Sequence, residues 1–231
     1  MQFDAWPEWV GKKYRVSFYV PSEFMTVAPK QALTALLKAR TREHHRRAEH
    51  AGIVARILRQ TVSRDEYRRY LHELAIIYAA MEERLSALRD HPRLAPLAAP
   101  GLARSPSLKR DLARLGARCQ GNQPMTLAGS RYRDRLLNAD LPMLVAHAYV
   151  RYLGDLNGGQ GLQRLLTEAL DLGPEGLSFY RFDAITDLES FVLQLRHAID
   201  RGVAADDHGR VVEEAALAFE FNILLAEAVV E

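Results

Sequence analysis

The sequence predicts a compact all-α domain, and three observations support this class. From about residue 30 onward, apolar residues recur at the three- and four-residue spacing of amphipathic helices, with no alternation of strands and helices and no internal repeat. A chain of 231 residues with 48% hydrophobic content can bury one good-sized core. A single cysteine, Cys119, excludes an intrachain disulfide framework and a cysteine metal site, and it fits a reducing cytoplasm.

Charge and hydropathy argue against a nucleic-acid-binding protein and against a membrane-spanning one. The formal net charge is only +2, with arginine far more common than lysine, which favours an anionic small ligand or an acidic partner over nucleic acid. No apolar run approaches the roughly 18 residues needed to cross a bilayer. The first residues do not have the layout of a secretory signal. We therefore expect a cytoplasmic monomer that has no membrane anchor and binds no nucleic acid.

Residues 1–29 differ from the rest of the chain. Residues 14–20 have a strand-like composition, and Pro7, Pro21 and Pro29 interrupt the segment. We expect an N-terminal extension of unknown structure here, followed by one helical domain over residues 30–231.

Helix signals then follow in order along the chain. A capping-box pattern, Ser63 to Glu66, marks the start of the second helix. Proline and glycine break residues 90–106, and turns are expected at 121–124 and 173–176. The expected helices cover residues 31–58, 63–88, 107–119, 141–170, 187–201 and 206–230.

The helix predicted over 141–170 carries an unusual group of glycines. Gly154, Gly158 and Gly159 are spaced so that they would share one side of a helix, although each glycine costs about 1 kcal/mol relative to alanine. A side of bare backbone would let a flat molecule lie against the main chain. Asp155 lies beside it, with no Lys or Arg three or four residues later. Close helix packing, or a loop, would also explain the glycines.

The first predicted helix carries three histidines, of which His44 and His45 are adjacent and point about 100° apart. The stripe around His45 is mostly small, so a flat ring could lie there above the imidazole. It consists of Thr41, Ala48, Glu49 and Gly52. Histidines exposed on a basic helix are the alternative reading.

Two segments resemble a known family. Residues 146–160, with Ala-His-Ala-Tyr, Arg-Tyr-Leu-Gly-Asp-Leu and Gly-Gly-Gln, resemble the distal-helix signature of the haem oxygenases. Residues 41–49, with Thr-Arg-Glu-His-His and Ala-Glu, are similar to the proximal segment, and the resemblance extends over about residues 31–228. It implies a helical bundle holding haem b between a proximal helix and a kinked distal helix. The implied reaction uses O2 and external electrons to cleave the ring at a meso carbon to biliverdin, carbon monoxide and ferrous iron.

The resemblance also implies roles for individual residues on the proximal side and at the haem edge. His45 would bind the iron, and Glu49 would accept a hydrogen bond from its other ring nitrogen. Lys38 and Arg196 would meet the haem propionates.

On the distal side, the resemblance implies that the backbone at Gly154 and Gly158 leaves room for oxygen. Asp155 would hold a water that delivers protons, with Tyr78 and Arg151 in the same network. Further positions implied to belong to the haem site are Tyr149, Gly159, Phe219 and Asn222.

The chain also departs from the family pattern. Val192 stands one turn before Arg196, where a second basic propionate contact would be expected, and Asn157 replaces a common serine. A haem carrier that does not degrade its ligand, a thiaminase-like enzyme on the same bundle and a plain helical interaction module are the alternatives. The arginine-rich first helix indicates an acidic electron donor, such as a ferredoxin, a flavodoxin or a reductase.

Overall fold

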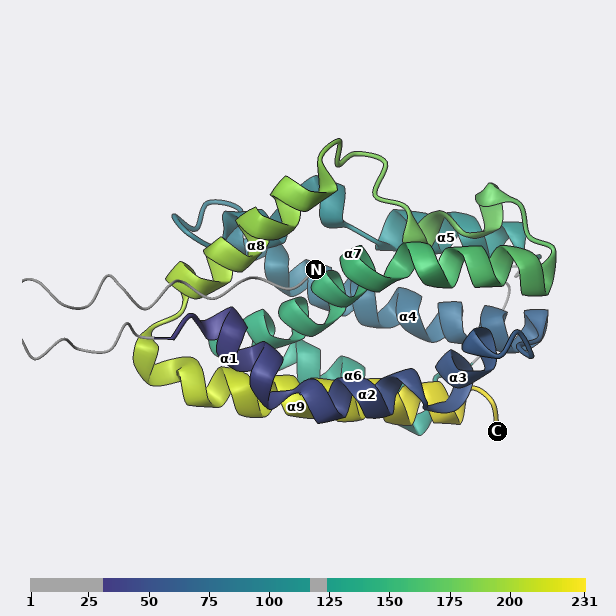
Figure 1. Ribbon diagram of the computed structural model, residues 1–231, viewed down its shortest axis with the longest axis horizontal. Coiled ribbons are helices and arrows are strands. Elements are labelled where there is room, and N and C mark those ends of the chain that lie inside the picture. Colours follow the sequence, from purple (N-terminus) through teal and green to yellow (C-terminus); the bar gives the residue numbers. More distant parts are fainter. Residues whose placement is uncertain (1–30, 117–123) are drawn as a thin grey trace, which may run out of the picture. The chain divides into compact units, whose positions relative to one another are not determined.

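The computed structural model describes residues 31–116 and 124–231, and these residues form helices and loops without a strand (Figure 1). The all-α prediction is therefore confirmed. The predicted N-terminal extension, Cys119 and most of the turn at 121–124 lie outside the described residues. The α-helices are α1 (Leu33–Arg40), α2 (Arg42–Glu49), α3 (Gly52–Leu58), α4 (Arg64–Leu85), α5 (Ser105–Arg114), α6 (Leu127–Leu137), α7 (Leu141–Leu170), α8 (Leu188–Gly202) and α9 (His208–Ala228).

Local signals fixed the starts of several helices. The backbone N–H of Glu66 donates to Ser63 Oγ at 3.2 Å and that of Ser63 donates to Glu66 Oε2 at 2.8 Å, so the predicted capping box of α4 is confirmed. Asp140 caps α7, which has the predicted bounds of 141 and 170. Asp187 caps α8 in the same way.

The prediction of one continuous helix over 31–58 is wrong, because the segment consists of α1, α2 and α3. Thr41 separates α1 from α2, and its hydroxyl donates to the Leu37 carbonyl at 2.8 Å. His50 and Ala51 separate α2 from α3, whose first residue, Gly52, has a φ of +41°, and a Cβ there would lie 1.9 Å from the Ala226 carbonyl oxygen. The chain turns here because α9 passes directly against it. Gly52 therefore does not belong to an open stripe around His45.

Helix α6 was missed by the sequence analysis. Thr126 caps its start, with a hydroxyl that accepts from the Gly129 N–H at 2.9 Å, while the buried Glu73 accepts from the Thr126 N–H at 2.7 Å. Few apolar residues mark its buried side, where Tyr132 and Leu136 are the large ones. The helical period was therefore weak.

Helices α7 and α9 pack along one another, and α4 packs on α5, α6 and α7 (Figure 1). Helices α1, α2 and α3 all lie against α9. This arrangement gives α2 and α7 a common neighbour. Within the described part of the chain, no helix is both long and apolar enough to span a membrane.

A buried carboxylate joins three of these helices. Glu214 of α9 accepts from Arg135 of α6 at 2.9 and 2.5 Å, and its Oε1 lies 2.9 Å from His147 Nε2 of α7. Burial alone would raise the pKa of Glu214, but the hydrogen bonds and charges of Arg135 and His147 outweigh it and lower the pKa to about 2.

Two glycines with positive φ give a matched stability test. Gly116 has a φ of +70° and open space around the Cβ position, whereas Gly52 faces the Ala226 backbone. We expect Gly116→Ala to lose about 1 kcal/mol from backbone strain alone, and Gly52→Ala to lose roughly 3 kcal/mol or more because α9 must also move. Urea unfolding of both variants measures the difference. Equal losses would contradict the close approach of α9.

The Glu214 cluster predicts a pH dependence. Because the folded pKa of about 2 lies below the ordinary value of 4.5, the stabilisation is fully present above about pH 4.5 and is lost as the pH falls toward 2. The shift corresponds to roughly 3 kcal/mol. Urea unfolding should therefore show Glu214→Gln well below the unmutated protein at about pH 6, with a smaller gap at about pH 3. A gap that does not change with pH would contradict this linkage.

Candidate functional site

The imidazole of His45 on α2 is accessible, with 57% of its side chain exposed. Its ring meets the ring of Phe219 from α9 edge-on, with centroids 5.8 Å apart. Glu49 Oε1 lies 3.6 Å from His45 Nδ1, which is close enough for an ion pair but too long for the hydrogen bond that the resemblance implies.

The neighbouring histidines are less available as ligands. His44 is half-buried, with its Nε2 3.7 Å from Glu220 Oε1. His147 is fully buried and bound to Glu214. Of these three histidines, His45 has the ring that a ligand could most readily reach.

Helix α7 has a bare strip in the middle of its length. Gly154 and Gly158 are exposed, and a Cβ built on either would meet nothing within 4 Å. Gly161 is equally open and extends the strip by a turn, although the sequence analysis did not single it out. Gly159 is buried, with its Cβ position 3.5 Å from Tyr180. The prediction that Gly159 shares the open side is therefore wrong.

Asn157 lies on the same exposed strip. Its Nδ2 donates to the Leu153 carbonyl at 2.6 Å, a contact from a side chain to the carbonyl four residues earlier. Contacts of this kind are associated with helix bending. The helix nevertheless continues without interruption from 141 to 170.

The strip and the histidine lie on helices that share α9 as a neighbour. Phe219 contacts His45, and Asn222, one turn further along α9, binds Arg151 of α7. An accessible imidazole on α2 and a strip without side chains on α7 fit a flat ring with a central metal. Side chains at Gly154 and Gly158 would fill the space that such a ring needs.

Behind the strip, the structure brings together four residues named from the sequence. The Tyr78 hydroxyl donates to Asp155 Oδ2, and Arg151 donates from Nε to the Tyr78 oxygen at 2.9 Å and from Nη1 to Asn222 Oδ1 at 2.8 Å. Arg151 Nη2 lies 3.8 Å from Asp155 Oδ1. Asp155 thus finds its cation four residues earlier in the helix, although no Lys or Arg follows it three or four residues later.

Burial dominates the protonation of this network. It raises the pKa of Asp155, although the charge of Arg151 and the hydrogen bond from Tyr78 oppose the shift. It also raises the pKa of Tyr78 well above the ordinary value, so the phenol stays protonated and donates. For Arg151, burial favours the neutral form, but Tyr78 and Asp155 outweigh it, raise the pKa and keep the guanidinium charged.

The predicted propionate contacts lie on α1 and α8. These two helices are joined where Asp200 accepts from Thr34 N at 2.7 Å and Thr34 Oγ1 at 3.1 Å. Lys38 on α1 and Arg196 on α8 are exposed. Burial raises the pKa of the nearby Tyr149, and the charge of Arg196 partly offsets this shift.

Val192, one turn before Arg196, is buried in the core. The absence of a basic residue at this position therefore agrees with the packing of α8.

The basic surface of the first helices is smaller than the sequence suggests. Arg46 pairs with Glu43, and Arg47 pairs with Glu220. Arg40 and Arg42 form no ion pair with a described residue and are exposed.

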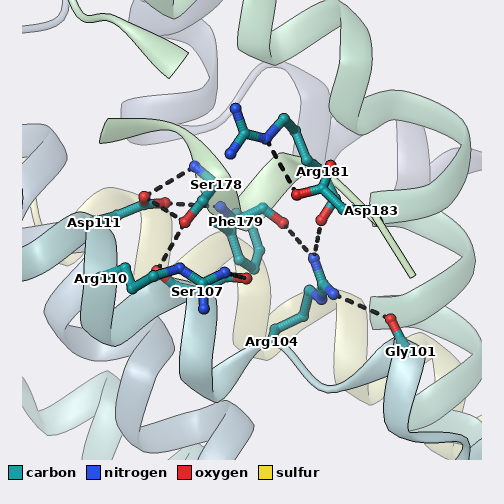
Figure 2. Close-up of polar contacts among 9 residues, drawn as sticks. All are labelled: Gly101, Arg104, Ser107, Arg110, Asp111, Ser178, Phe179, Arg181 and Asp183. Carbon is teal, nitrogen blue, oxygen red and sulfur yellow. Dashed lines mark hydrogen bonds and ion pairs between the residues drawn. The ribbon is translucent and has the colours of Figure 1, made fainter. Parts of the chain in front are cut away.

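Arg104 and Asp111 are buried charges that bind the main chain of residues 178–181, the segment that packs against Tyr78 (Figure 2). Neither residue was identified from the sequence. Asp111 of α5 accepts from Ser178 N, Ser178 Oγ and Phe179 N at 2.6 to 2.8 Å. Arg104 donates to the carbonyls of Phe179 at 3.0 Å and Arg181 at 2.5 Å.

This segment is placed directly against the network. Phe179 meets the Tyr78 ring edge-on at 5.5 Å, and Tyr180 covers Gly159. The sequence shows that Asp111 and Arg104 are charged but not what they bind, because their partners are main-chain groups about 70 residues away.

Comparison with known proteins connects this geometry to one family. The family model described as heme oxygenase matches residues 31–228. Heme oxygenase 1 of Synechocystis sp. is 36% identical over 196 residues, covering 83% of this chain and 82% of that protein. Human heme oxygenase 1 is 38% identical over 209 residues, covering 87% and 73%.

The Synechocystis heme oxygenase-1 crystal structure, in complex with heme, superposes with a TM-score of 0.79 and 34% identity, covering 85% of this chain and 91% of that one. The sequence match includes both the helix that carries the accessible histidine and the helix that carries the bare strip. The chain therefore belongs to the haem oxygenase family.

Proposed function

We propose that this protein degrades haem, using O2 and external electrons to open the ring at a meso carbon and release biliverdin, carbon monoxide and ferrous iron. One observation carries the proposal. The accessible imidazole of His45 and the bare strip at Gly154 and Gly158 lie on helices packed against the same α9, with the carboxylate of Asp155 directly beside the strip.

The described residues divide into those that would hold haem and those that would handle protons. His45 would bind the iron, and Glu49 would orient its ring once the 3.6 Å contact shortens. Lys38 and Arg196 would meet the propionates, Tyr149 would also belong to the haem site, and the strip would leave the distal face of the ring free of side chains. When bound, haem supplies both the iron at which O2 is reduced and the carbon that is oxidised.

The distal residues would supply protons to that face. Burial raises the pKa of Asp155 toward neutral pH. A group whose pKa lies nearer the working pH both takes up and releases protons more effectively. Tyr78 holds Oδ2 of this carboxylate by its hydroxyl, and Arg151 holds Tyr78 and faces Oδ1. Asp155 would in turn hold the water that delivers protons.

We further infer a cytoplasmic monomer that receives electrons from an acidic donor such as a ferredoxin, a flavodoxin or a reductase. Arg40 and Arg42 support docking of this donor, since their charges are available on the surface beside α2.

His45→Ala tests the proximal assignment. We expect the variant to lose the Soret band and low-spin spectrum of bound haem, because the iron loses its imidazole, and to regain them when free imidazole is added. Haem titration followed by absorbance measures this. His44→Ala is the matched control and should bind haem normally. Loss of the spectrum in this control, with His45→Ala unaffected, would show that the ligand is another histidine.

Asp155→Ala tests the role of the carboxylate. Haem should still bind, but biliverdin formation with a reductant in air should fall about tenfold or more, because proton delivery loses its acceptor. With hydrogen peroxide, oxidation of a phenol such as guaiacol should rise instead. Asp90→Ala, at an exposed position, is the control. An unchanged biliverdin yield in Asp155→Ala would remove this residue from the mechanism, and an unchanged Soret band in the unmutated protein would indicate a carrier.

A further inference from the structure

Helix α2 carries His45, but burial anchors it weakly. The helix is eight residues long and contains no buried residue, and the chain breaks at both of its ends separate it from α1 and α3. Ala48 is the one apolar residue in its sequence, and it is only partly buried against the core. The direction in which the imidazole points therefore depends on the polar contacts of α2.

An ion pair with two hydrogen bonds joins α2 to α9. Arg47 donates from Nη1 to Glu220 Oε1 at 2.5 Å and from Nη2 to Glu220 Oε2 at 3.0 Å. His44 Nε2 lies 3.7 Å from the same Oε1, which is too long for a hydrogen bond. A guanidinium that meets both oxygens of a carboxylate fixes the orientation of the two groups as well as their distance.

This pair and the His45 contact lie on different sides of α2. At about 100° per residue, Arg47 lies about 200° further round the helix than His45. Their partners are neighbours on α9, since Phe219 meets the His45 ring and Glu220 binds Arg47. Contact with Phe219 alone would let α2 turn about its own axis, whereas a second contact on the far side prevents that rotation. The rotation of α2 decides where the imidazole points.

We propose that Glu220 is a positioning residue for the iron ligand, because by binding Arg47 it fixes the rotation of α2 and so directs the His45 imidazole toward the ring. This inference rests on the proposed function and adds a residue of α9 to the proximal side of the site. The side chains of Arg47 and Glu220 are 47% and 34% exposed, so solvent screens the pair and its effect should be moderate.

Helix α2 also offers a matched control pair. Arg46 donates from Nε to Glu43 Oε2 at 3.0 Å and from Nη2 to Glu43 Oε1 at 2.6 Å, so this guanidinium also meets both oxygens of its carboxylate. Both residues of this pair belong to α2. Removing it changes the charge of the helix in the same way but leaves the link to α9 in place.

Haem transfer tests the link without measuring activity. Glu220→Ala and Arg47→Ala, each loaded with ferric haem, should pass it to excess apomyoglobin about fivefold faster than the unmutated protein, because the imidazole is held less firmly. Glu43→Ala and Arg46→Ala should match the unmutated protein. Arg47→Ala combined with Glu220→Ala should be no faster than either single variant, since both remove the same pair. Exchange of the two charges, Arg47→Glu with Glu220→Arg, should restore slow transfer.

Resonance Raman spectroscopy of the ferrous protein supplies the second measurement, through the iron–histidine stretching band. This band should shift or broaden in Glu220→Ala and Arg47→Ala and recover in the charge exchange, while the free energy of unfolding of the haem-free variants stays close to that of the unmutated protein. A purely structural role for the pair would instead lower the free energy of unfolding and leave the band unchanged.

The remaining outcomes separate this inference from the function on which it rests. Normal transfer and an unchanged band in both Glu220→Ala and Arg47→Ala would overturn the positioning role and leave the proposed function intact. A double variant that is faster by the product of the two single effects would show that the side chains act independently, and this would also overturn the role. No Soret band of bound haem and no biliverdin from the unmutated protein would overturn the function itself.

Discussion

The guanidinium of Arg151 is buried where α4, α7 and α9 meet, and it ties one residue of each neighbouring helix into the same network. It donates to Tyr78 on α4 and to Asn222 on α9, and it faces Asp155 one turn further along its own helix. A buried charge without such partners would cost several kcal/mol. The network therefore constrains the three helices together, and with them the position of Asp155 beside the open strip.

The glycines of α7 depend on this support. Each glycine in a helix interior lowers stability by about 1 kcal/mol relative to alanine. Gly154, Gly158 and Gly161 do not offset this cost by packing, because nothing lies near their exposed side. The opposite side compensates through buried contacts, including Leu156 and Leu166 in the core. A strip of this kind persists only in a helix that the rest of the bundle holds firmly.

The sequence predicted the features that depend on neighbours along the chain. The capping box at Ser63, the bounds of α7 and the all-α class follow from local spacing, and the resemblance named the Tyr78, Arg151 and Asp155 network. What it missed depends on distant contacts. The turn at Gly52 exists because α9 passes against it, Gly159 is covered by Tyr180, and Arg104 and Asp111 act on a main chain about 70 residues away. The spacing of residues along the chain cannot predict contacts between such distant segments.

The rotation of a helix between consecutive residues explains how one element can serve two environments. Gly154 leaves its side of α7 without a side chain, which suits a ring that must exclude water, while Asp155, about 100° further round, is held by Tyr78 and Arg151 and borders a polar cavity. A ring bound on the strip would lie against bare main chain, with the carboxylate directly beside it. Moving the carboxylate back by one residue would place it on the strip itself, so the order Gly-Asp suits this arrangement.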